Sequence, residues 1–307
     1  MIKKVKKAFK NPSLVLLYLL NTKIGRLLSD RLYLKIKYRL TMHKKLNLKN
    51  PQEYDEKLQW LKLYDRKDIY TTISDKYAVR EYIKDAIGEE YLVPILGVWA
   101  DPNQIDFNSL PDQFVLKCTH DSGGLSLCKN KATFNFLEAK QKIDKRFRNN
   151  YYWGGREWQY KNITPRVIAE PVLLDKNGNL PWDYKFMCFE GEPKLLFLDI
   201  GVCEFDNYGG HAEEYYRNIY DIDFNPVDMI ETRQHYKIDE IKKPDNYDEM
   251  VRIVRTLCKG FHHCRVDLYN IDGKIYFGEI TLHHGSGYNS FEPAEWGKTL
   301  GDWIKLS

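Results

Sequence analysis

The chain has 307 residues, of which 43% are hydrophobic and 29% charged, and its formal net charge is +4. This length is sufficient for a full hydrophobic core in one large domain or in two to three lobes. The mild basic excess suits a nucleotide, an acidic glycan or a membrane face as partner, but it is too small to indicate nucleic-acid binding. No apolar run approaches the roughly 18 residues needed to cross a bilayer.

Residues 1–44 form a basic and apolar N-terminal segment. Five lysines surround or precede a short apolar run from Leu14 to Leu20, and Ile2, Val5 and Phe9 fall on one helical face. No small-residue cleavage site follows, so we do not predict a signal peptide. We interpret the segment as a packing helix with a solvated lysine face. A peripheral contact with the anionic inner membrane leaflet stays open as the alternative.

Apolar periodicity predicts two helices in the N-terminal part of the chain, residues 53–65 and 75–87. In the second of these, Ser74 is the predicted N-cap and Gly88 the predicted end. A third, basic helix is expected at residues 134–148.

The C-terminal half combines strands with one clear helix. We predict a strand at residues 166–174, a hairpin at 184–200 that turns at 190–193, and mixed polar loops with a short strand at 204–245. The pattern Asn246-x-x-Glu249 predicts a capped helix that Gly260 closes. Because strands and helices alternate and several strands form hairpins, we predict an α+β fold with antiparallel sheets.

Cysteines and paired histidines are the candidate ligands of a zinc site. The six cysteines form no C-x-x-C pair and several lie in apolar patterns, so we expect buried, reduced thiols in a cytosolic protein. Neither His262-His263 nor His283-His284 makes a convincing site, because adjacent strand residues point to opposite faces and no third ligand is suitably spaced. His283 or His284 is still a candidate for lining a substrate pocket.

The segment 113–130 places a lysine inside an apolar strand and follows it with two glycines. Burial of Lys117 there is unfavourable unless an anion pairs with it. The turn behind it contains Ser122, Gly123 and Gly124, whose N–H groups can form an anion-binding nest. This combination suits a phosphate, although it is not a Walker A loop because the lysine precedes the glycines. An edge-strand lysine beside an ordinary hairpin turn is the alternative.

The last hairpin carries Arg265, Asp267 and Glu279, and its turn decides which of them share a face. A two-residue turn at 272–273 would place residue 267 opposite 278 and point Glu279 to the other side. A three-residue turn would place Arg265 opposite Glu279 and Asp267 opposite Phe277, with all three polar side chains on one face. We predict this second register because it separates polar from apolar residues better. The apolar face would then carry Val266, Leu268 and Tyr276.

Two carboxylates beside an arginine are suited to hold Mg²⁺ on a triphosphate, since magnesium takes a few carboxylate oxygens and leaves phosphate and water to complete its shell. The alternative is an exposed Arg–Glu pair of little energetic value. Together with the Lys117 turn, the pattern favours a nucleotide site.

Six segments, taken in order, resemble the TupA-like ATP-grasp family: DKYAVREYI, FVLKCTHDSGG, REWQYKNITPRVIAEPVL, DYKFMCFEGEPK, FHHCRVDLYNIDGKIYFGEITLHHGSG and WGKTLGDWIKL. The resemblance covers about residues 45–307, and the family is found among polysaccharide and teichuronopeptide biosynthesis genes. It implies an ATP-grasp fold, in which two α+β lobes hold ATP between antiparallel sheets. The implied division is a helical and linker region at 45–113, a small lobe at 114–174, and a C-terminal lobe with the metal site at 175–307.

The resemblance also implies roles for residues at matching positions. Lys76 and Lys117 look like phosphate-contacting lysines, and Lys185 falls where a ribose or phosphate contact is expected. The remaining nucleotide positions are the mobile loop over the phosphates and the segment that meets adenine, namely Ser122, Gly123 and Gly124 and then Glu170, Pro171 and Val172.

For the metal, the resemblance implies that Asp267 and Glu279 bind Mg²⁺ or Mn²⁺, with Arg265 close by as a catalytic residue beside Lys117. Wider ATP-grasp enzymes usually carry Glu-x-Asn where this chain has Glu279-Ile280-Thr281. Whether Thr281 supplies the third contact, through its hydroxyl or a water, therefore stays open.

The implied activity is an ATP-dependent carboxylate–amine ligase that works through an acyl phosphate in cell-surface polysaccharide biosynthesis, with an acidic sugar or other carboxylate and an amine or amino acid as substrates. A glycosyltransferase is a second reading, for which the only D-x-D sequence is Asp221-Ile222-Asp223. A non-catalytic, membrane-associated partner of polysaccharide assembly proteins is a third.

Overall fold

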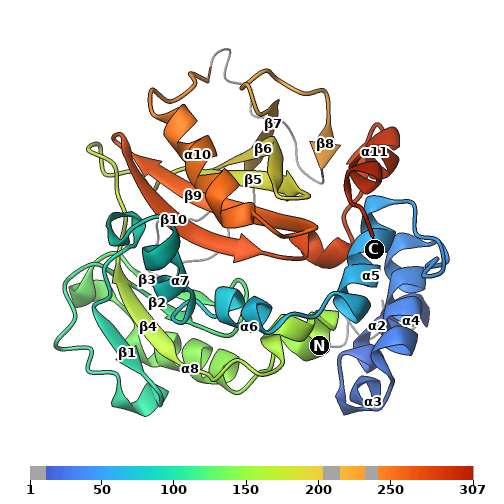
Figure 1. Ribbon diagram of the computed structural model, residues 1–307. Coiled ribbons are helices and arrows are strands. Elements are labelled where there is room, and N and C mark those ends of the chain that lie inside the picture. Colours follow the sequence, from blue (N-terminus) through green and yellow to red (C-terminus); the bar gives the residue numbers. More distant parts are fainter. Residues whose placement is uncertain (1–11, 203–214, 232–240, 307) are drawn as a thin grey trace.

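The computed structural model describes residues 12–202, 215–231 and 241–306 (Figure 1). Two antiparallel sheets dominate it. The first has the order β1-β4-β2-β3, and the second has the order β10-β9-β5-β6-β7. Figure 1 shows them as two layers, one above the other. The predicted α+β fold with antiparallel sheets is therefore confirmed.

The strands of the first sheet are β1 (Gly97–Trp99), β2 (Phe114–Cys118), β3 (Leu125–Cys128) and β4 (Val167–Pro171). Those of the second are β5 (Asp183–Phe189), β6 (Glu192–Ile200), β7 (Tyr216–Asp221), β9 (His263–Ile271) and β10 (Lys274–Thr281). A short pair joins β8 (Ile230–Glu231) to β11 (Phe291–Glu292).

The α-helices of the described residues are α2 (Pro12–Leu20), α3 (Lys23–Arg26), α4 (Asp30–Met42), α5 (Tyr54–Tyr64), α6 (Asp68–Ser74), α7 (Val79–Ala86), α8 (Phe136–Phe147), α9 (Tyr152–Gly155), α10 (Tyr247–Cys258) and α11 (Glu295–Trp303). None of them has the length and apolar character that a bilayer-spanning segment requires. The predicted face of Ile2, Val5 and Phe9 lies outside the described residues.

The helix predicted at 75–87 starts later than expected, and Ser74 is not its N-cap. Ser74 is the last residue of α6, and α7 begins at Val79. Between them, Asp75 Oδ1 accepts hydrogen bonds from the backbone N–H groups of Tyr77 (2.9 Å) and Ala78 (3.3 Å). An aspartate that bonds to the backbone two and three residues ahead favours a turn, and this interrupts the helical pattern.

The helix after Asn246 begins where predicted, but its capping box does not form. Asn246 instead accepts a hydrogen bond from Asn270 Nδ2 (2.6 Å) and donates one to the carbonyl of Gly273 (2.8 Å). Glu249 accepts a hydrogen bond from the hydroxyl of Tyr91. The start of α10 is therefore tied to the last hairpin, which carries the predicted metal ligands.

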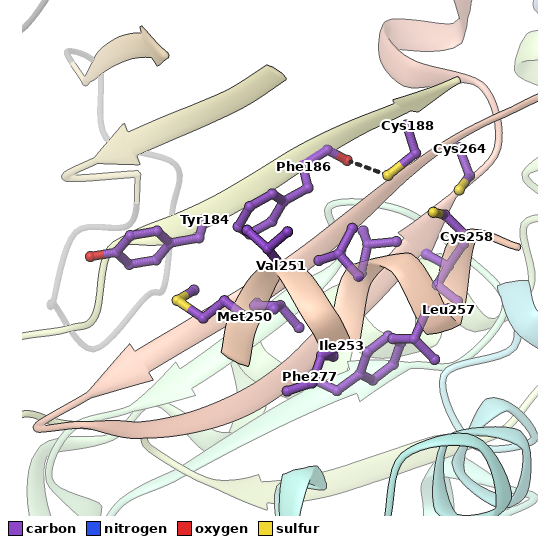
Figure 2. Close-up of a cluster of buried hydrophobic side chains, with 14 of the residues drawn as sticks. Tyr184, Phe186, Cys188, Met250, Val251, Ile253, Leu257, Cys258, Cys264 and Phe277 are labelled. Carbon is purple, nitrogen blue, oxygen red and sulfur yellow. Dashed lines mark hydrogen bonds between the residues drawn. The ribbon is translucent and has the colours of Figure 1, made fainter. Parts of the chain in front are cut away.

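One face of the second sheet packs against α10 and forms the largest core cluster. In Figure 2, Met250, Ile253 and Leu257 of α10 lie against Phe186 of β5 and Phe277 of β10. Burial of each such side chain contributes about 1.5–3 kcal/mol. Because strand side chains alternate, this packing turns the intervening residues of β5 and β9 to the opposite face, toward the first sheet.

The five described cysteines are buried and free, as predicted, and Cys203 lies outside the described residues. Cys188, Cys258 and Cys264 lie close together in the core, at the C-terminal end of α10 (Figure 2).

His263 is a buried part of the fold, and it makes stability depend on pH. Its imidazole lies 2.9 Å from the hydroxyl of Tyr54 on α5 and 2.8 Å from the carbonyl of Cys188. Burial lowers its pKa to about 3. The His263 imidazole is therefore neutral at pH 5 in the folded state, whereas in the unfolded state it binds a proton below about pH 6.5.

We expect this histidine to contribute a loss of about 2 kcal/mol in unfolding free energy between pH 7 and pH 5, since the unfolded chain binds more protons there. Urea unfolding at the two pH values checks this. In His263→Gln the pH dependence should shrink by that amount, and in His262→Gln it should not. Equal pH dependence in both variants would contradict the assignment.

Candidate active site

A cavity of about 620 Å³ lies between the two sheets, and we call it the inter-sheet cavity. Its walls come from β2, β3 and β4 on one side and from β5, β6, β9 and β10 on the other. All predicted site residues line it: Lys76, Lys117, Ser122, Gly123, Gly124, Glu170, Pro171, Val172, Lys185, Arg265, Asp267, Glu279 and Thr281. Folding thus brings together segments separated by more than 200 positions in the sequence.

Lys117 reaches this cavity because β2 alternates. Phe114, Leu116 and Cys118 are buried against α8, which leaves Val115 and Lys117 on the cavity face. The side chain of Lys117 is 28% exposed, so the strand buries it in part. The alternation of the strand points it into the cavity, where its charge can contact a ligand.

An anion does pair with Lys117, as its setting requires. Its Nζ lies 2.6 Å from Oε2 of Glu170 on the neighbouring strand β4. Arg80 Nη1 approaches the other carboxylate oxygen of Glu170 at 4.0 Å. Glu170 is thus positioned by the predicted phosphate lysine, and both belong to one polar face of the small sheet.

Lys76 contacts the turn after β2 through both its side chain and its backbone. Its Nζ donates to the backbone carbonyl of Asp121, and its own N–H donates to the carbonyl of Thr119 (3.1 Å). The neighbouring Asp75 is held by the chain on both sides. Its Oδ1 accepts from the N–H groups of the turn before α7, and its Oδ2 accepts a hydrogen bond from Arg166 Nη1 at 3.2 Å. The ammonium group therefore stands beside the residues that close the turn after β2.

The turn itself requires its glycines. Gly123 has φ +75°, in the left-handed region that favours glycine. A Cβ on Gly124 would lie 2.3 Å from Oδ2 of the buried Asp121. A side chain at either position would distort the turn, so both glycines have a conformational role in it.

The hairpin register differs from the prediction, and the difference lies in a β-bulge. The turn has two residues, Asp272 (φ +50°) and Gly273 (φ +87°), so the predicted three-residue turn was wrong. The pairing shifts by one at Gly278, which places Glu279 opposite Asp267. Tyr276 pairs with Tyr269, so it also lies on the polar face and not with Val266.

This bulge keeps the apolar residues of β10 on the core face and its polar residues on the cavity face. Ile275 and Phe277 before it, and Ile280 after it, are buried in the core. Without the extra residue, Glu279 would point into that core, because a shift of one residue exchanges the faces of a strand. Gly278 also allows close approach, since a Cβ there would lie 3.0 Å from the carbonyl oxygen of Asp267. The polar residues share one face, as predicted, but by a different route.

Two cations hold the acidic residues. Arg265 binds both oxygens of Asp267, at 2.6 Å each, and Glu279 Oε1 at 2.7 Å. Lys185 Nζ lies 3.2 Å from Asp267 and 3.0 Å from Asp183. Burial favours the neutral form of Asp267, but Arg265 and Lys185 outweigh it and keep the pKa of its carboxyl below the usual value. Asp267 is therefore ionised at neutral pH.

The donor set fits a magnesium-type ion that shares its shell with phosphate. No group of three or more His, Cys, Asp or Glu residues within the described ranges could hold a metal by itself. Asp267 and Glu279 offer carboxylate oxygens on neighbouring strands, which is what Mg²⁺ takes when phosphate and water complete its coordination. The hydroxyl of Thr281 donates to Glu279 Oε1 at 3.0 Å, so it orients a predicted ligand.

A family model described as TupA-like ATPgrasp matches residues 56–305 of the chain. The chain belongs to the TupA-like ATP-grasp family. This confirms the family inferred from the six segments, and with it the ATP-grasp fold. A search of curated proteins found no match.

Solved structures show more distant similarity to this TupA-like chain. D-alanine–D-alanine ligase from Bacillus anthracis has TM-score 0.40 and 15% identity over 69% of this chain and 57% of that one. The enzyme of that name from Helicobacter pylori has TM-score 0.43 and 12% identity, over 83% and 68%. L-amino acid ligase from Bacillus licheniformis has 0.40 and 12%, over 76% and 49%. The chain spans 57% of the B. anthracis ligase, and similarity at this level assigns no activity.

Beside the predicted metal ligands, and lining the same inter-sheet cavity, lies a buried polar network that sequence reasoning missed. Arg217 of β7 binds Asp199 of β6 through two hydrogen bonds of 2.6 Å and also contacts Glu231 of β8. His284 Nε2 lies 3.0 Å from Glu231 and its Nδ1 lies 2.8 Å from Arg265 Nη1. Because arginine only donates, Nδ1 accepts, and the neutral ring donates through Nε2 to Glu231.

The network also accounts for His284, which was predicted only as a candidate pocket residue and does line the inter-sheet cavity. Burial lowers its pKa, which keeps the ring in the neutral form that this bonding needs. His283 lines the cavity as well, and its Nδ1 contacts Gln159 Nε2 at 3.2 Å. Asp199, Arg217 and Glu231 carried no signal in the sequence, since each is a single charged residue outside the motifs that marked the site.

Proposed function

We propose that this TupA-like protein is an ATP-dependent ligase that joins a carboxylate to an amine. One observation carries the proposal: Lys117 on one sheet and Asp267 and Glu279 on the other line the same inter-sheet cavity. Lys117 on one wall and the two carboxylates on the other suit a triphosphate with its divalent ion. Family membership supports the same nucleotide.

In the proposed reaction, a carboxylate oxygen attacks the γ-phosphorus of ATP, and ADP leaves. The amine then attacks the acyl carbon, and inorganic phosphate leaves as the amide forms. Lys117, Lys76 and the Ser122–Gly124 turn would hold the phosphate oxygens and neutralise charge during transfer. Glu170, Pro171 and Val172 would border adenine, and Lys185 the ribose or a phosphate. Arg265 would orient Asp267 and Glu279 and stabilise the transferred group.

Asp267 and Glu279 would hold Mg²⁺ or Mn²⁺, with Thr281 as an orienting neighbour. When bound, the ion supplies charge neutralisation at the β- and γ-phosphate oxygens. The network of Arg217, Glu231 and His284 would keep Arg265 in position through the contact of His284 with its guanidinium.

The substrate class follows the family's association with polysaccharide and teichuronopeptide genes. We propose an acidic sugar, such as a uronic acid, or another carboxylate as acceptor, and an amine or amino acid as nucleophile. The reaction would take place in the cytoplasm, where ATP is present. No observation favours a glycosyltransferase. Asp221 of the D-x-D sequence accepts hydrogen bonds from the backbone N–H groups of Asp223 (3.0 Å) and Asn225 (2.8 Å), so it serves to form a turn.

Two measurements test the proposal. ADP release should require both a carboxylate and an amine. ATP with Mg²⁺ should raise the melting temperature of the protein, because a ligand that binds the folded state stabilises it. Nucleoside diphosphate sugars should not raise it, because they would not bind this site. Stabilisation by such sugars with none by ATP would contradict the proposal.

Asp267→Asn should abolish the metal-dependent part of ATP binding. At a concentration of about 100 Kd, ATP with Mg²⁺ stabilises the folded state by about 2.7 kcal/mol, and the part of this that requires Mg²⁺ should disappear. Thermal melts with and without Mg²⁺ measure this. Asp272→Asn is the matched control, because it makes the same change in the turn of the same hairpin. A full Mg²⁺-dependent shift in Asp267→Asn would exclude this residue as a ligand.

A further inference from the structure

The N-terminal helices expose an apolar surface next to exposed cations. Seven apolar residues of α2, α3 and the turn after α3 are more than a third exposed: Leu14 (46%), Val15 (37%), Leu16 (42%), Tyr18 (71%), Leu19 (37%), Ile24 (61%) and Leu27 (86%). Four basic residues nearby in sequence are also exposed, Lys23, Arg26, Arg31 and Lys35. We call these eleven residues the N-terminal surface. Figure 1 shows their helices grouped at one edge of the molecule beside α5.

Packing explains only one side of α2. Leu17 and Leu20 join the cluster around Tyr33 and Leu34 of α4, which fixes the helix to the protein. The rest of α2 is equally apolar in sequence, PSLVLLYLL, and faces outward. A helix that is apolar all round but packed on one side leaves a surface that water does not favour.

Charge separates this region from the rest of the chain. Residues 1–50 contain fourteen Lys and Arg residues and one acidic residue, Asp30, so their net charge is +13. Residues 51–307 contain 33 basic and 42 acidic residues, so their net charge is −9. The overall value of +4 hides this asymmetry. A strong asymmetry of this kind indicates a polyanionic partner for the basic part.

We infer that the N-terminal surface docks on an anionic lipid bilayer. Exposed apolar side chains flanked by lysine and arginine are what an interfacial helix presents to acyl chains and headgroups. Each basic residue near such a surface contributes attraction, and the acidic remainder of the chain is repelled. The two effects together orient the protein with α2 and α3 toward the bilayer. A polyanionic glycan would satisfy the charges but would not cover the apolar side chains.

Vesicle flotation of the full chain tests this inference without ATP, so the result does not depend on the proposed ligase activity. Vesicles of phosphatidylcholine with about one-third phosphatidylglycerol should bind the protein, and pure phosphatidylcholine should bind it at least tenfold more weakly. Raising the salt from about 0.1 M to about 1 M should weaken binding, because the Debye length shortens from about 10 to 3 Å.

Two sets of variants separate charge from insertion. Lys23→Gln, Arg31→Gln and Lys35→Gln combined should weaken binding at low salt about 100-fold. Tyr18→Ser, Ile24→Ser and Leu27→Ser combined should weaken it at both low and high salt. The matched controls lie on other elements: Lys145→Gln, Lys176→Gln and Lys259→Gln combined, and Leu137→Ser, which is 70% exposed. Unchanged melting temperatures would show that all variants fold.

Three results would overturn the inference. One is the absence of binding to anionic vesicles at low salt. Another is an equal loss of binding in the test and control variants. The third is a dimer in light scattering that the serine variants dissociate, together with no vesicle binding, which would assign the apolar surface to a second copy of the chain.

Discussion

Lys117→Ala is expected to lower ATP-dependent amide formation by about 10²- to 10³-fold, the usual loss when one charge-stabilising donor is removed from a transition state. Lys117 projects into the inter-sheet cavity, and its removal would also leave Glu170 without its 2.6 Å partner. Steady-state kinetics with varied ATP measures the effect. The loss should appear mainly in kcat if Lys117 contacts the transferred phosphoryl group, since that contact strengthens in the transition state.

Two variants make this test specific. Lys117→Arg keeps the charge and should retain more activity than alanine, although a guanidinium differs in shape from an ammonium group. Lys274→Ala removes an exposed strand lysine of β10 and should leave turnover unchanged. If Lys117→Ala turns over at the normal rate, the proposed phosphate contact is wrong.

Arg217→Met is expected to destabilise the fold by about 3–5 kcal/mol, because it leaves two buried carboxylates without their cation. Asp199 and Glu231 are 2% and 1% exposed, and Arg217 contacts both. Although burial opposes it, His284 and Arg217 hold the pKa of Glu231 below its usual value. Without Arg217, one of the two carboxyls would take up a proton or water would enter.

Urea unfolding at pH 7 measures the change. Arg252→Met is the matched control, since its side chain is 63% exposed on α10 and should alter the unfolding free energy by less than about 1 kcal/mol. A similarly small change for Arg217→Met would show that the network contributes little to stability. The variant should also lose activity if His284 positions Arg265, which an assay at a temperature below its melting point can detect.

Much of the site could be predicted because its two halves are local in sequence. The alternation in β2 and the glycines after it mark Lys117 and its turn, and Asp272-Gly273 marks the last hairpin. What failed was the register, because a bulge at Gly278 depends on how Ile275, Phe277 and Ile280 fit under α10. The position of a bulge cannot be predicted from the number of residues in the turn, because it depends on this packing.

The N-cap at Ser74 failed for a related reason. Ser74 and Asp75 are both good capping residues, and local propensity does not choose between them. In the structure neither residue caps α7, whose N-cap is Ala78. Asp75 forms a turn instead, and its other oxygen binds Arg166, which lies 91 positions away. Long-range contacts thus decide a detail that sequence pattern leaves open.

The antiparallel α+β character, the family and the polar residues of two separate segments could be predicted without coordinates, because periodicity, turn chemistry and motif order follow from the order of residues along the chain. The folded structure was needed to see that these segments share one cavity, that Glu279 faces Asp267, and that Arg217, Glu231 and His284 form a network along the same cavity. The physical reason is that a buried charge is tolerated only where partners surround it. Those partners come from strands distant in sequence, so no local pattern records them.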